Sequence, residues 1–233
     1  MRGMKAMILA AGRGDRMRPL TDRLPKALLE AGGKPLIVHV IERLARSGYT
    51  ELVVNVSHYA GMIEHALGNG SRYGVRIVYS REAQPLETGG GIACALPLLG
   101  ESPFLAVNSD IHCDFDLARL AAVAATLAPD GTLAHLVLVD NPPHHPGGDF
   151  ALSDGRVSGA GPALLTFSGI GVYSPALFAK VAPGARCQLA ALLAPAMAHG
   201  LVSGEHHRGL WMDIGTPLRL QALERALAAR GAH

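Results

Sequence analysis

Short apolar runs rich in β-branched residues alternate with amphipathic stretches along this chain. The runs comprise residues 5–11, 51–57, 75–80, 104–110, 132–139 and 164–173. Residues 35–47, 58–69, 89–99 and 116–127 carry apolar side chains three and four positions apart, the spacing of one helix face. Strands and helices in alternation predict a largely parallel sheet that is covered on both faces. We therefore expect a Rossmann-like α/β fold with a mixed, mostly parallel central sheet flanked by helices.

The pattern loosens after residue 140. Prolines and glycines make residues 141–149 a loop, and residues 150–161 read as a short hairpin with an Asp154–Gly155 turn. Two further helices are expected at 186–199 and 216–230; Thr216 can cap the second, and Pro217 suits its first position. No linker, repeat or low-complexity segment interrupts the chain, so we expect a single domain over residues 1–233.

Composition excludes several classes of protein. The 233 residues are 49% hydrophobic with a net charge near +2, which disfavours disorder and a surface built for nucleic acid. No apolar run approaches the ~20 residues of a membrane span, and residues 1–11 do not read as a signal peptide. Cys94, Cys113 and Cys187 are far apart and form no CxxC pair, which argues against a disulfide framework and a cysteine-based zinc site. We expect a cytoplasmic protein without a membrane or nucleic-acid partner.

Positive charge is concentrated directly after the first apolar run. Residues 12–26 contain five of the 21 Lys and Arg residues and two acids, whereas the rest of the chain is about neutral. A buried parallel strand that runs into a glycine-rich turn delivers backbone N–H groups at the carboxyl edge of a sheet, where open α/β folds bind ligands. Gly12 and Gly14 let that backbone approach a phosphate closely. Arg13, Arg18 and Arg23 are simply interpreted as solvated loop charges, whereas Arg16 and Lys26 are candidate phosphate ligands.

Two familiar phosphate motifs are absent. Met17 stands where the third glycine of G-x-G-x-x-G belongs, and no G-x-x-x-x-G-K-[ST] occurs. The run LAAGRGDRMRPLTDRLPKALLEAGGKPLI instead resembles the signature of the sugar-1-phosphate nucleotidyltransferases, L-A-A-G-x-G-x-R-x-x-P-x-T followed by P-K and G-K-P. The resemblance implies that an NTP and a sugar-1-phosphate are the substrates. It also implies that Arg16 and Lys26 are catalytic and neutralise the phosphates, while the loop backbone binds the nucleotide, at Ala10, Ala11, Gly12, Arg13 and Gly14.

Two aspartates match the metal ligands of that family. Asp110 ends the apolar run FLAVNSD, and Asp213 lies in WMDIGT. Taken alone, an aspartate after a strand or before a helix is most often a turn former or a cap. The resemblance implies that both hold Mg²⁺, which favours carboxylate, phosphate and water oxygens. Asn108, in the same segment as Asp110, is assigned to the nucleotide. The D-x-D motif of related glycosyltransferases is absent.

The segment after the third strand, SREAQPLETGGGIACAL, matches the base-binding part of the family. The implied base ligands are Glu82, Thr88 and Gly89, and Glu87 replaces the usual glycine. P-L-E-T-G-G-G-I resembles a narrower subgroup, the N-acetylmuramate-1-phosphate uridylyltransferases of cell-wall recycling, which favours UTP. Guanine stays open, because a carboxylate at Glu82 can accept from both N1–H and the 2-amino group, whereas uracil offers only N3–H. Main-chain groups near Thr88 would suit uracil without Glu82.

The remaining assignments concern the sugar ligands and the part of the chain that binds each substrate. Residues 1–140 would bind the nucleotide, 141–210 the sugar, and 211–233 would supply the second metal ligand and the last helix. The implied sugar ligands are Gly148, Asp149, Ser168 and Gly169. The His-His pairs at 144–145 and 206–207 have poor spacing for zinc. A mannose-1-phosphate guanylyltransferase, a nucleotide-sugar sensor and a glycosyltransferase remain alternatives, and we expect a monomer or weak dimer.

Overall fold

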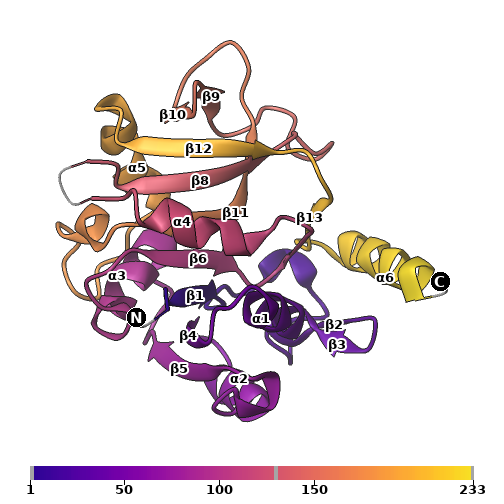
Figure 1. Ribbon diagram of the computed structural model, residues 1–233. Helices are drawn as coiled ribbons and strands as arrows, with labels where there is room; N and C mark the ends of the chain where they lie inside the picture. Colours follow the sequence, from indigo (N-terminus) through magenta and orange to yellow (C-terminus); the bar gives the residue numbers. More distant parts are fainter. Residues whose placement is uncertain (1–2, 129–130, 232–233) are drawn as a thin grey trace.

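The computed structural model describes residues 3–128 and 131–231 (Figure 1). A nine-stranded sheet in the order β5-β4-β1-β6-β11-β8-β12-β10-β9 forms its centre. Pairing is parallel from β5 to β6 and between β8 and β12, so only β11 and β10 run against the other strands. The strands are β1 Ala6–Leu9, β4 Glu51–Val56, β5 Arg76–Arg81, β6 Phe104–Asn108, β8 Ala134–Val139, β9 Ala151–Ser153, β10 Arg156–Ser158, β11 Thr166–Tyr173 and β12 Val202–His207.

Helices cover both faces of this sheet. Successive strand side chains point to opposite faces, so Ile8 of β1 packs in one core and Met7 in another. The first core contains side chains of α1 Leu36–Arg46, α2 Ala60–Leu67 and α4 Leu120–Ala124. The second contains side chains of α3 Glu87–Leu99 and α5 Leu189–Ala198. The expected α/β class with a mixed, mostly parallel sheet is confirmed.

Two small ladders and the last helix lie beside the main sheet. The ladders join β2 Glu30–Ala31 to β3 Lys34–Pro35, and β7 Ile111–Cys113 to β13 Trp211–Asp213. Helix α6, Pro217–Gly231, lies beside β2 (Figure 1). It packs Leu220 and Leu223 against Met17 and Leu36 in a third core. The C-terminal helix thus rests on the segment that follows β1. Short 3-10 helices complete the fold, at Asp15–Met17, Lys26–Leu28, Ser71–Tyr73, Leu117–Arg119 and Pro175–Phe178.

Most expected elements are found, and the main differences concern residues 116–127 and strand β12. The expected turn at Asp154 and Gly155 has positive φ at both residues, as a two-residue hairpin turn of type I′ requires. The helix expected at 116–127 is a 3-10 turn followed by the short α4. Strand β12 was not predicted, because VSGEHH lacks an apolar run and forms a strand only by pairing with β8. No helix within the described ranges is long and apolar enough to span a membrane.

Candidate active site

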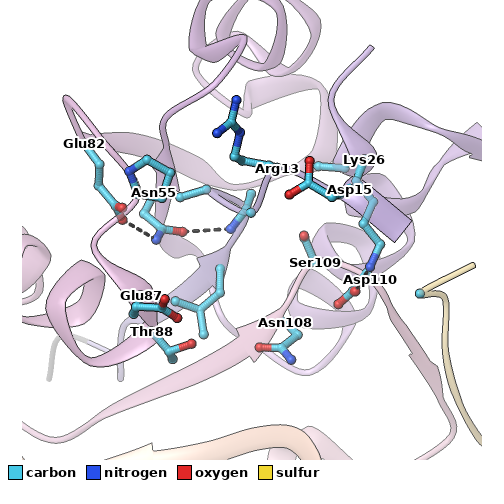
Figure 2. Close-up of a pocket in the computed structure, with 18 of the residues that line it drawn as sticks. Arg13, Asp15, Lys26, Asn55, Glu82, Glu87, Thr88, Asn108, Ser109 and Asp110 are labelled. Atoms are coloured by element: carbon cyan, nitrogen blue, oxygen red, sulfur yellow. Dashed lines mark hydrogen bonds and ion pairs between the residues drawn. The ribbon is translucent and has the colours of Figure 1, made fainter. Parts of the chain in front are cut away.

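A cavity of about 550 Å³ lies at the carboxyl ends of β1, β4 and β6 (Figure 2). This is the edge at which open α/β sheets bind ligands. Eleven of the residues that the sequence analysis proposed line it: Ala10, Ala11, Gly12, Arg13, Gly14, Arg16, Lys26, Glu82, Thr88, Asn108 and Asp110. Segments far apart in the sequence therefore meet in one place.

The glycine loop is held to the sheet by a buried side chain. The backbone N–H of Ala10 donates to Oδ1 of Asn55 at 2.7 Å, which ties the end of β1 to the neighbouring strand β4. Gly14 has φ of +70°, and a Cβ there would lie 2.9 Å from Cβ of Lys26. Only glycine combines that left-handed backbone with so close a contact. Gly12 is exposed and has open space around it, so its backbone faces the cavity unobstructed.

The cations of the loop divide into two groups. The Lys26 ammonium forms an ion pair with Oδ2 of Asp110, and both side chains are mostly shielded from solvent. Arg13 and Arg16 are exposed and line the cavity. Arg18 pairs at 3.5 Å with two exposed acids of its own segment, Asp15 and Asp22. Arg18 thus has the surface role expected of it, while Arg13 faces the cavity.

The ladder between β7 and β13 brings Asp110 and Asp213 together. Asp213 is paired with Ile111, and the N–H of Ile214 donates to the carbonyl of Asp110 at 2.8 Å. Asp110 lines the cavity directly, whereas near Asp213 the cavity is lined by Gly215. The Asp213 carboxylate forms ion pairs at 2.9 Å with Arg219 and with His144.

These carboxylates suit a divalent cation. Their oxygens are hard ligands, and each charge is already balanced by a basic side chain, Lys26 for Asp110 and Arg219 for Asp213. A cation with bound phosphates can replace such contacts without leaving a bare charge. The donor set therefore fits Mg²⁺ better than a soft metal.

At the other end of the cavity, Glu82 is part of a buried network. Its Oε1 accepts from Nδ2 of Asn55 at 2.7 Å, and its Oε2 accepts from the N–H of Leu86 at 2.9 Å. Glu82 is only 6% exposed. Both oxygens accept hydrogen bonds from within the protein, so the carboxylate orients Asn55 and the start of α3. Thr88 lines the cavity, while Gly89 packs against the 187–189 backbone and does not.

The four proposed sugar residues lie outside the cavity lining. Ser168 is fully buried and its hydroxyl donates to the Val137 carbonyl at 2.6 Å. Gly169 has φ of +80° at an irregularity of β11 and packs against Asn108, which does line the cavity. Asp149 accepts from the N–H of Phe167 at 2.8 Å and pairs with His145. Gly148 has φ of +65° and a backbone packed against Leu164. Of these contacts, only that of Gly169 is with a residue that lines the cavity, Asn108.

Sequence reasoning missed several lining residues. Asn55 is a polar residue inside the apolar run ELVVNV, a signal that was available. Glu87 was noted only as a departure from a glycine, and its side chain lines the cavity. Arg186 comes from the loop before α5 and had no sequence signal, because only the fold brings it here. The other lining residues not proposed are Leu9, Asp15, Ala27, Pro85, Ser109 and Gly215.

A second cluster lies outside this cavity. Ligand atoms of Cys113, Asp114 and His207 are within 4.8 Å of one another, a mixed group that a search for cysteine pairs overlooks. Burial raises the pKa of the Cys113 thiol, and the Arg43 guanidinium faces that thiol. A fixed positive charge beside the sulfur opposes cation binding, so the cluster is better described as an internal polar contact.

Comparison with known proteins gives a consistent result. Residues 5–148 match the model of the family described as nucleotidyl transferase. The chain is 51% identical over 230 residues to the N-acetylmuramate alpha-1-phosphate uridylyltransferase of Neisseria meningitidis serogroup B, covering 97% of this chain and 99% of that protein. It is 33% identical to a mannose-1-phosphate guanyltransferase of Aspergillus fumigatus, over 92% of this chain and 61% of that one.

The fold is also similar to that of a solved nucleotidyltransferase structure. The crystal structure of a putative glucose-1-phosphate thymidylyltransferase from Bacillus anthracis superimposes with a TM-score of 0.85 at 20% identity, covering 97% of this chain and 95% of that one. Together with the glycine loop and the cavity at the carboxyl edge of the sheet, the match over most of the chain leaves one assignment: this chain belongs to the nucleotidyl transferase family.

Proposed function

We propose that this protein joins UTP to N-acetylmuramate α-1-phosphate and releases pyrophosphate, a step of cell-wall sugar recycling. One observation carries the proposal: Lys26, Asp110 and the glycine loop converge on a single cavity. A basic loop opposite a carboxylate is what a polyphosphate and its counter-cation require. The choice of sugar and base rests on the relative of 51% identity, which is named for them.

In the proposed reaction an oxygen of the sugar phosphate attacks the α-phosphorus of UTP. The new P–O bond forms as the bond from the α-phosphorus to the bridging oxygen breaks, and that oxygen leaves with its electron pair on pyrophosphate. The attacking phosphate is already anionic at neutral pH, so no general base is needed. Catalysis then consists of positioning and charge stabilisation.

The chain's own residues divide these tasks. The backbone of the glycine loop, from Ala10 to Gly14, cradles the nucleotide phosphates. Arg16 binds the β- and γ-phosphates, and Lys26 moves from Asp110 to the two reacting phosphates. Asn108, at the end of β6, lies on the cavity floor beside Gly169 and contacts the nucleotide. The loop around Gly148 and Asp149, with Ser168 behind it, frames the sugar.

Members of this family generally use a divalent metal ion. We infer that Asp110 and Asp213 hold Mg²⁺, which when bound neutralises the α-phosphate and the departing pyrophosphate. Before it binds, Lys26 and Arg219 hold these carboxylates in place.

Pyrophosphate release tests the proposal. Purified protein is incubated with Mg²⁺, each of the four NTPs, and N-acetylmuramate, mannose or glucose 1-phosphate. Release only with UTP and N-acetylmuramate 1-phosphate is expected. GTP with mannose 1-phosphate as the preferred pair would replace the proposal with the guanylyltransferase alternative. No release with any pair would favour a sensor or a glycosyltransferase.

A further inference from the structure

A contact at the end of the cavity opposite Lys26 was not anticipated. Glu87, the first residue of α3, has a backbone φ of +63°, a value that residues other than glycine rarely adopt. Its Oε1 accepts from two nitrogens of Arg186, with Nε at 3.1 Å. Both residues line the cavity. Figure 2 shows Glu87 beside Thr88 and on the opposite side from Lys26 and Asp110.

The loop that carries Arg186 is fixed to α3 by the backbone. The N–H of Gly90 donates to the Cys187 carbonyl, and the N–H of Cys187 donates to the Leu86 carbonyl, both at 2.9 Å. Glycine at position 90 is required for this approach, because a Cβ there would lie 2.3 Å from the Ala185 carbonyl. These backbone hydrogen bonds place Arg186 next to Glu87. The ion pair between the two side chains adds to them and is not needed to hold the loop.

The hydrogen-bonding state of the two carboxylates at this end differs. Both oxygens of Glu82 accept from internal donors, Asn55 and Leu86. Within the described part of the chain, Oε1 of Glu87 is taken by Arg186 and Oε2 accepts no hydrogen bond. One carboxylate oxygen of Glu87 is thus free, and Arg186 and Thr88 line the same cavity as Glu87. Together these residues offer a guanidinium donor, a carboxylate acceptor and a hydroxyl donor.

We propose that Arg186, Glu87 and Thr88 form the edge that reads the base and selects uracil, an inference that rests on the proposed uridylyl transfer. The N3–H of uracil donates to Oε2 of Glu87, and its two carbonyls accept from Arg186 and Thr88. Guanine would bring N1–H and the 2-amino group side by side and needs both oxygens of one carboxylate. Arg186 withholds one of them. Strained backbone at Glu87 is explained if the side chain is needed in the cavity.

Two substitutions separate this role from a structural one. Arg186→Ala frees the second Glu87 oxygen, so the ratio of kcat/KM for GTP to that for UTP should rise about tenfold, the worth of one hydrogen bond. Glu87→Gly relieves the positive φ yet should weaken UTP binding by a similar factor, about tenfold. A purely structural Glu87 would be replaced by glycine without loss. The Arg186 side chain is 72% exposed, so its removal should leave the protein folded.

The matched control is Arg119→Ala. Arg119 is likewise exposed and pairs with a partly buried glutamate, Glu205, away from the cavity lining. Binding of UTP, dTTP and GTP is measured by calorimetry without sugar, and turnover is measured separately. Thymine shares the uracil edge, so dTTP should bind and lose affinity in Glu87→Gly as UTP does.

The outcomes are distinct. An unchanged GTP-to-UTP ratio in Arg186→Ala, or full UTP affinity in Glu87→Gly, would overturn this inference while uridylyl transfer stands. Equal changes in Arg119→Ala would also overturn it, since the effect would not be local. If the wild-type protein binds UTP but turns over no sugar phosphate, the proposed function fails, and the base-reading edge is still tested by the binding data.

Discussion

Lys26 and Asp110 form an ion pair at one end of the cavity although 84 positions separate them in the sequence. The contact joins the glycine-loop segment to the end of β6. It holds the ammonium of Lys26 and the carboxylate of Asp110 side by side in the free protein. In the proposed reaction, a nucleotide would take over the contact of Lys26 and its cation the contact of Asp110. The ion pair thus keeps both groups ordered in the free protein.

Loss of either partner should impair catalysis. Lys26→Ala and Asp110→Ala are each expected to lower kcat/KM about 100-fold, as is typical when a group that stabilises charge in the transition state is removed. Steady-state pyrophosphate release measures the effect. Lys34→Ala serves as control, because Lys34 pairs with Glu42 outside the cavity lining. Near-normal turnover in a folded Lys26 or Asp110 variant would remove that residue from the proposed mechanism.

The geometry of Arg16 should matter as well as its charge. Lysine is a point charge and does not reproduce the planar, bidentate fork of a guanidinium on phosphate oxygens. We expect Arg16→Lys to retain only part of the activity and Arg16→Ala less still, with the KM for UTP rising in the same order. Wild-type kinetics in Arg16→Lys would show that the fork is unnecessary.

Asn55 should affect both stability and nucleotide binding. Asn55→Ala removes the acceptor for Ala10 N–H and the donor to buried Glu82, so unfolding should become easier by about 1–3 kcal/mol. Chemical denaturation measures that loss, and UTP titration should show weaker binding because the glycine loop is no longer tied to β4. Ser71→Ala, on an exposed surface turn, is the comparison. Unaltered UTP affinity would mean that the loop is held by other contacts.

Acid stability should depend on Glu205. A hydrogen bond from His135, with the nearby charge of Arg119, holds the pKa of Glu205 below its ordinary value. The folded state therefore gains stability from this carboxylate above its unfolded pKa of about 4.5, and the gain is lost as pH falls through the lower folded pKa. Glu205→Gln should lower the melting temperature at neutral pH and narrow its gap to wild type near pH 3. A constant gap between pH 7 and pH 3 would contradict this.

The sequence predicted a strand or helix correctly where the local pattern of apolar residues matches the burial of that element in the fold. Apolar runs such as 51–57 and 104–110 are strands because they are buried on both faces of the sheet, and the signature around Arg16 and Lys26 marked one wall of the cavity. Strand β12 was missed because its glycine and histidines carry no strand pattern, and only the ladder with β8 makes it extended.

Contacts between distant segments explain the remaining gaps. Two backbone hydrogen bonds fix the 185–187 segment to the start of α3, and this brings the Arg186 side chain to Glu87. No local sequence pattern encodes these contacts. Ser168 was chosen from its segment, but its hydroxyl is consumed inside the sheet. The resemblance of the segment implied a sugar ligand, and burial decided the partner of the Ser168 hydroxyl.

The ladder between β7 and β13 has a consequence for biosynthesis. Strand β13 and helix α6 come from the last part of the chain, yet they complete the surroundings of Asp110 and cover Met17 near the opposite end. A polypeptide emerging from the ribosome can assemble the sheet from β5 to β6 early, but Asp110 and Asp213 become neighbours only after β13 has been made. A chain whose translation stops before residue 213 therefore has Asp110 without the strand that brings Asp213 beside it.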